Sequence, residues 1–143
     1  MRTVNEIIVH CTATVIGKDY RAADIKKWHT LPPPQGNGWK DIGYHYVIDI
    51  DGKIEPGRPI DQKGAHCSGH NENTVGICYV GGLLPNKKPF DTRTDAQKAS
   101  LRNLITALKY CFPTIDKVSG HRDYADKTCP CFDAALEYNH LVQ

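Results

Sequence analysis

Hydrophobic and polar positions follow two different periods along the chain, and together they predict a mixture of strands and helices. Residues 4–9 form a short run rich in β-branched side chains that ends at His10, which is typical of a buried strand whose last residue lies at a sheet edge. Residues 75–82 are almost continuously apolar, so we expect a strand buried on both faces in the centre of the sheet. A further short strand is expected at 117–119.

A hairpin is expected between the first two of these strands. Residues 43–50 lead into Asp51-Gly52, a signal for a tight two-residue turn, and residues 53–56 form the returning strand. The period of two predicts which side chains share a face. It places Tyr44, Tyr46 and Ile48 on one face and His45, Val47 and Asp49 on the other.

The first of three expected helices spans residues 21–30, where apolar side chains recur at helical spacing. Asp19 is the residue we expect to cap its N-terminus. The helix stops at residues 31–38, where three prolines and two glycines predict a surface loop.

Two further helices are expected in the second half of the chain. Thr94 and Gln97 form a capping-box pattern that opens a helix running to about Cys111. A closing helix is expected near residues 133–141. The pattern therefore predicts an α/β (α+β mixed) fold, in which residues 1–143 form a single domain with a central mixed sheet flanked by about three helices.

Composition narrows the class of protein. With 143 residues, 40% hydrophobic and 24% charged, the chain fits one globular domain and excludes a membrane-embedded or disordered protein. The net charge of +2 is too balanced to indicate a nucleic-acid partner. No signal-peptide pattern is visible, and the apolar runs are too short for a membrane span. We expect a monomer without nucleic-acid or membrane partners.

The six cysteines permit disulfides, free thiols or metal ligands, and their spacing does not decide between these. Cys129 is the cysteine that has candidate partners in a metal site, namely His10 and His121, each of which follows a predicted strand end. Two imidazoles and a thiolate form a known catalytic zinc set that leaves a fourth position for water. By spacing alone, hydrogen-bonded histidines and a buried thiol without metal explain these residues at least as well.

Five segments, taken in their order along the chain, favour the metal site over the explanation without metal. They are His10-Cys-Thr-Ala-Thr, Trp39-Lys-Asp-Ile-Gly-Tyr-His-Tyr, Gly64-Ala-His-Cys-Ser-Gly-His-Asn, Thr74-Val-Gly-Ile-Cys-Tyr-Val-Gly-Gly, and Gly120-His-Arg-Asp through Lys127-Thr-Cys-Pro. Together they resemble the successive motifs of the zinc-dependent N-acetylmuramoyl-L-alanine amidases of type 2, a family that includes amidase-type phage lysozymes and peptidoglycan recognition proteins. The resemblance spans residues 10–130, and it implies that His10, His121 and Cys129 bind one zinc ion.

The same resemblance implies roles for three further residues. Tyr44 would lie beside the metal and Lys127 would point at the reacting carbonyl, where amide hydrolysis builds negative charge and the departing amine needs a proton. His66 resembles a histidine of the substrate groove. Without the motifs, Tyr44 would be a strand residue that packs its ring, Lys127 a solvated surface charge and His66 a hydrogen-bonded loop residue.

The resemblance implies hydrolysis of peptidoglycan at the amide between the lactyl group of N-acetylmuramic acid and L-alanine of the stem peptide. Two alternatives stay open. Some members of the family bind peptidoglycan without cutting it, typically after loss of the cysteine ligand, which is present here as Cys129. The chain could also be a thiol hydrolase with Cys129 or Cys131 as nucleophile and His121 as base.

Two features depart from the family pattern. The prolines at 32–34 look like an insertion that either borders the groove or simply connects helix and hairpin, and Cys131 follows the ligand by two residues. Without a visible signal peptide, we expect a phage or prophage endolysin that is made in the cytoplasm and acts on the cell wall after release. An exported toxin and an enzyme that recycles wall fragments stay open.

Overall fold

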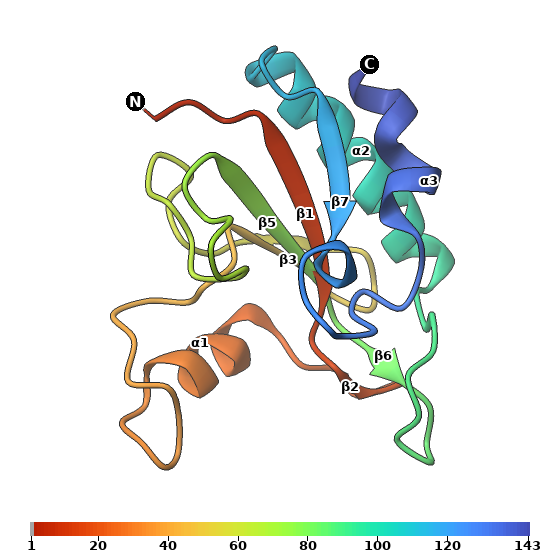
Figure 1. Cartoon of the computed structure of the whole chain (residues 1–143). Coiled ribbons are helices and arrows are strands. Elements are labelled where there is room, and N and C mark those ends of the chain that lie inside the picture. Colours follow the sequence, from red (N-terminus) through yellow and green to blue (C-terminus); the bar gives the residue numbers. More distant parts are fainter. Residues whose placement is uncertain (1) are drawn as a thin grey trace.

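The computed structural model describes residues 2–143 and is built around a five-stranded sheet (Figure 1). Its strands run in the order β4-β3-β5-β1-β7, and every neighbouring pair is parallel except the β3–β4 hairpin. The strands are β1 (Glu6–Cys11), β3 (Tyr46–Ile48), β4 (Ile54–Pro56), β5 (Thr74–Tyr79) and β7 (Lys117–Gly120), while β2 (Thr14–Val15) and β6 (Gly82–Leu83) form a small second sheet. The apolar run therefore forms the central strand β5, and the prediction of a mixed sheet is confirmed.

Three α-helices flank this sheet: α1 (Ala22–Thr30), α2 (Asp95–Cys111) and α3 (Ala134–Tyr138). Two short 3-10 helices, η1 (His121–Asp123) and η2 (Asn139–Val142), complete the fold. The capping box of α2 is confirmed, because Thr94 Oγ1 accepts from Gln97 N and Gln97 Oε1 accepts from Thr94 N, both at 3.0 Å. No helix within residues 2–143 is long and apolar enough to cross a membrane.

The helices cover opposite faces of the sheet. In Figure 1, α2 and α3 lie together on one side and α1 lies apart from them. Ile7 and Val9 of β1 pack with Leu101 and Ile105 of α2 in the larger core. Because side chains alternate along a strand, His10 points to the other face of the sheet. This is the face on which α1 packs its buried Ile25 against Ile42, Val47 and Val80.

The loop of the β3–β4 hairpin is longer than predicted. Asp49 N donates to Lys53 O and Gly52 N donates to Asp49 O, both at 2.9 Å. These bonds leave three residues, 50–52, between the paired positions. The prediction of a two-residue turn is therefore wrong, and the hairpin uses the three-residue arrangement with a glycine at its end.

Tyr44 does not share a face with the other two residues predicted beside it. The chain bends at His45, ahead of β3, so the strict alternation holds only from Tyr46 onward. Tyr46 and Ile48 pack in the α2 core, whereas Tyr44 packs with Val47 on the opposite face. This bend brings the Tyr44 ring to the same face as His10.

Two helix ends also differ from the prediction. Asp19 does not cap α1: the N-cap is Arg21, whose backbone N donates to Asp24 Oδ2 at 2.8 Å. Asp19 instead forms an ion pair with the Arg21 guanidinium at 3.0 Å. The closing α-helix ends at Tyr138, and a 3-10 turn continues to Val142.

Candidate active site

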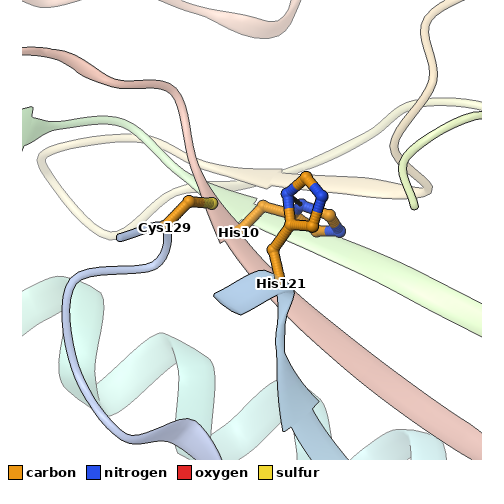
Figure 2. A group of neighbouring side chains, drawn as sticks. All are labelled: His10, His121 and Cys129. Carbon is orange, nitrogen blue, oxygen red and sulfur yellow. Dashed lines mark hydrogen bonds between the residues drawn. The ribbon is translucent and has the colours of Figure 1, made fainter. Parts of the chain in front are cut away.

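His10 and His121 come together because of the register between two parallel strands. β1 pairs with β7 so that Val9 lies opposite Gly120. His10 directly follows Val9, and His121 directly follows Gly120. The Nδ1 atoms of His10 and His121 are 3.2 Å apart. Figure 2 shows these two side chains and Cys129 pointing toward one another from β1, from the end of β7 and from the loop that follows.

The loop that carries Cys129 is fixed by hydrogen bonds and by close packing. Arg122 N donates to Cys129 O at 2.7 Å, and the buried Tyr79 hydroxyl donates to Pro130 O at 2.7 Å. Gly120 makes the approach possible, since a Cβ at this position would lie 2.8 Å from Pro130 Cδ. Tyr79 was predicted only as a strand residue, so its part in holding this loop is a finding of the structure.

The donor set fits a zinc ion. Ligand atoms of His10, His121 and Cys129 all lie within 4.8 Å of one another. Burial lowers the pKa of both histidines, that of His10 well below its usual range, and the Lys127 ammonium contributes in the same direction. Both imidazoles are therefore neutral at pH 7, which is the form that binds a metal. Two imidazoles and one thiolate are a ligand set of catalytic zinc sites.

The thiol alternative for Cys131 has little support in its surroundings. Cys131 Sγ is oriented toward Gly82 O, at 3.5 Å. Burial raises the pKa of the Cys131 thiol to about 11, whereas a nucleophilic cysteine needs a depressed pKa. Cys129 Sγ, by contrast, accepts from Cys11 N at 3.1 Å. All six cysteines, which lie within the described residues, are free thiols.

Tyr44 lies beside the candidate metal site, as the motifs imply. Its ring centroid is 5.1 Å from that of His10 and 5.5 Å from that of His29. His29 Nδ1 accepts from Gly43 N at 2.9 Å, so it fixes the backbone next to Tyr44. Burial raises the pKa of Tyr44 well above its ordinary value. Its hydroxyl therefore stays protonated and can donate a hydrogen bond.

A cleft of about 390 Å³ opens next to His121, within the size range of ligand sites. The exposed Lys127 lines it together with His121, and the positive charge of Lys127 contributes to the lowered pKa of both candidate histidine ligands. The polar and aromatic residues that line the cleft are Trp39, His66, Ser68, Asn71, His121, Tyr124 and Lys127. Trp39 and Asn71 occur in the motifs, but no site role was assigned to them from the sequence.

His66 lines the cleft and also contacts His10, a candidate metal ligand. It is 8% exposed, and its Nδ1 lies 2.8 Å from His10 Nε2. Its Nε2 lies 3.2 Å from Thr74 Oγ1, and Asn71 Oδ1 accepts from His66 N at 3.0 Å. A role in substrate binding stays a prediction for His66, while sequence reasoning missed its contact with His10 because no local pattern joins the two residues.

Comparison with known proteins agrees with this geometry. Residues 1–132 match the family described as N-acetylmuramoyl-L-alanine amidase. The chain belongs to this family. The amidase is 40% identical over 140 residues to the endolysin of Klebsiella phage KP32, an alignment that covers 96% of this chain and 89% of the relative.

Solved structures share the fold of this amidase. The N-acetylmuramoyl-L-alanine amidase LysC from Clostridium intestinale is 28% identical with a TM-score of 0.77, covering 95% of this chain and 82% of that chain. Drosophila PGRP-LB is 26% identical with a TM-score of 0.77, covering 96% and 80%. The predictions of the family, of an amidase enzyme and of a peptidoglycan-recognition-protein-like fold are confirmed.

Proposed function

We propose that this amidase uses a zinc ion held by His10, His121 and Cys129 to hydrolyse the amide between the lactyl group of N-acetylmuramic acid and L-alanine in peptidoglycan. The observation that carries the proposal is the meeting of three metal-ligating atoms beside a cleft, in a chain of an amidase family. A zinc ion bound there supplies Lewis acidity, which polarises a carbonyl and makes water a better nucleophile.

Tyr44 and Lys127 are the residues that we propose assist the reaction directly. Negative charge develops on the carbonyl oxygen during amide hydrolysis, and the departing amine must gain a proton. The Tyr44 ring lies against that of His10, and Lys127 lines the cleft together with His121. Each can donate a hydrogen bond to developing negative charge, and each carries a proton that the amine can take.

The relatives support a proposal for the biological setting. The endolysin of phage KP32 aligns with nearly the whole chain, which supports an endolysin that acts on the bacterial cell wall. We also propose that residues 1–143 work as one catalytic domain and as a monomer, with peptidoglycan or its fragments as substrate.

Digestion of purified peptidoglycan by the full chain, followed by mass spectrometry, tests this function. We expect free stem peptides and intact glycan strands, loss of activity with a chelator, and recovery when zinc is added. Cys129→Ala should lose both zinc and activity, whereas the matched variant Cys131→Ala should keep both. Activity that survives chelation or Cys129→Ala would remove the metal from the mechanism, and new reducing ends would indicate a glycosidase.

A further inference from the structure

A chain of hydrogen bonds leads from a backbone carbonyl to the candidate ligand His10. The Thr74 hydroxyl donates to His70 O at 2.7 Å and lies 3.2 Å from His66 Nε2. His66 Nδ1 in turn lies 2.8 Å from His10 Nε2. Both ring nitrogens of His66 are therefore engaged by the protein, one by a hydroxyl and one by a ligand histidine.

The His70 carbonyl at one end of this series determines which atom donates in each hydrogen bond. A carbonyl oxygen can only accept, and a hydroxyl has a single hydrogen. Because Thr74 donates that hydrogen to His70 O, it must accept from His66, whose proton then lies on Nε2. The bare Nδ1 of His66 accepts from His10 Nε2. The proton of His10 consequently lies on Nε2, and its Nδ1 lone pair is free.

We propose that Thr74 and His66 are positioning residues that hold His10 in its Nε2–H tautomer, with Nδ1 presented to the metal. The inference rests on the proposed function in that His10 is taken as a zinc ligand. A histidine ligand binds through the nitrogen that carries no proton, and a partner on the other nitrogen fixes both the tautomer and the ring orientation. The free His10 Nδ1 is the atom that faces His121 Nδ1 at 3.2 Å.

The hydrogen-bonded series from Thr74 through His66 to His10, called the relay below, is shielded from solvent by burial. Thr74 is 4% exposed, His66 8% and His10 1%, so solvent offers little replacement for a lost partner, and an unpaired polar group there is costly. Gly76 of β5 leaves room for the ring, because a Cβ at that position would lie 2.6 Å from His66 Cγ and Cδ2. The neighbouring strand thus holds the His66 ring against its two partners.

The tautomer of His66 is the direct test. Long-range ¹⁵N–¹H correlation spectra of the full-length, zinc-loaded protein distinguish a protonated from a bare ring nitrogen, and the signals that disappear in His66→Asn identify the residue. We expect the proton of His66 on Nε2 and a bare Nδ1. A proton on Nδ1, in either the neutral or the doubly protonated ring, would overturn the proposal.

A pair of Thr74 variants tests the consequence for the metal. Thr74→Val keeps the shape but removes the hydroxyl, which frees His66 to place its proton on Nδ1 and to push the His10 proton onto the metal-facing nitrogen. We expect zinc affinity, measured by competition with a chromophoric chelator, to fall on the order of 10-fold in Thr74→Val. Thr74→Ser keeps the hydroxyl and should bind zinc like the unchanged protein.

Equal zinc affinity in both Thr74 variants would contradict the relay, whether both are weakened or neither is. Urea unfolding in the presence of chelator shows whether each variant is folded. If Thr74→Val does not fold, His66→Asn and His66→Leu take its place, because an asparagine oxygen can still accept from His10 Nε2 and leucine cannot. Equal zinc affinity in this second pair would also contradict the relay. Absence of stem-peptide release by the unchanged protein would refute the proposed function and leave the tautomer result standing.

Discussion

His45 offers a quantitative test of how burial sets the behaviour of this fold with pH. The side chain is 1% exposed, its Nδ1 accepts from Gly76 N at 3.0 Å, and its Nε2 donates to Gln62 O at 2.8 Å. Burial lowers the pKa of His45 to about 4; the Gln62 carbonyl opposes this, and the Arg2 guanidinium adds to it. We therefore choose His45→Asn, which removes the titrating group while retaining polar atoms.

The sign of the effect follows from the two pKa values. In the unfolded chain a histidine titrates near 6.5, so between about pH 6.5 and pH 4 the unfolded state binds more protons than the folded state. The contribution of neutral His45 is fully present above pH 6.5 and is lost progressively as the pH falls toward 4. Between about pH 7.5 and pH 4.5 the loss amounts to about 2.5 kcal/mol.

Urea unfolding at these two pH values, with chelator in every sample because zinc binding itself depends on pH, measures this loss. We expect His45→Asn to be less stable at pH 7.5, where its packing and hydrogen bonds are altered. The stability gap should then shrink by about 2.5 kcal/mol at pH 4.5, since asparagine does not titrate. His140→Asn, which removes an exposed imidazole, is the control. A constant gap for His45→Asn at both pH values would refute the reasoning.

Two further substitutions separate the support of the site from its chemistry. Tyr79→Phe leaves the Pro130 carbonyl buried without its donor. We expect the free energy of unfolding in urea to fall by about 1–3 kcal/mol and zinc binding through Cys129 to weaken. An unchanged midpoint of urea unfolding would contradict this. Lys127→Ala should lower kcat for stem-peptide release about 100-fold at unchanged zinc affinity, while Lys63→Ala, a lysine in an exposed ion pair, should behave like the unchanged protein. A parallel loss of zinc would assign Lys127 a role in metal binding instead.

Local patterns predicted the elements of this fold where the physical cause lies within a few residues. The capping box at Thr94 and Gln97 closes on itself, so the start of α2 could be read directly. The apolar run at 75–82 predicted a central strand, since only a strand covered on both faces buries every side chain. The motifs likewise indicate the candidate ligands His10, His121 and Cys129, because each motif is a short local run of residues.

Prediction failed where two local signals competed or where the partner was distant. Asp19 and Asp24 are both suitable capping residues near Arg21, and the ion pair of Asp19 with the guanidinium leaves Asp24 to bind the backbone. The prediction of which face Tyr44 occupies was wrong, because a bend at His45 interrupts the alternation of side chains. No sequence pattern reports such a bend, which depends on how the preceding loop packs.

The sequence by itself determined which residue types this protein brings to a site: two histidines that follow predicted strand ends and a cysteine in a later loop, in the order typical of an amidase. Only the tertiary structure decided how they meet. His10 and His121 are 111 residues apart, and the parallel register of β1 with β7 sets them side by side. The bond between His66 and His10 joins residues 56 positions apart, and it depends on how the loop that carries His66 packs against the sheet rather than on local sequence.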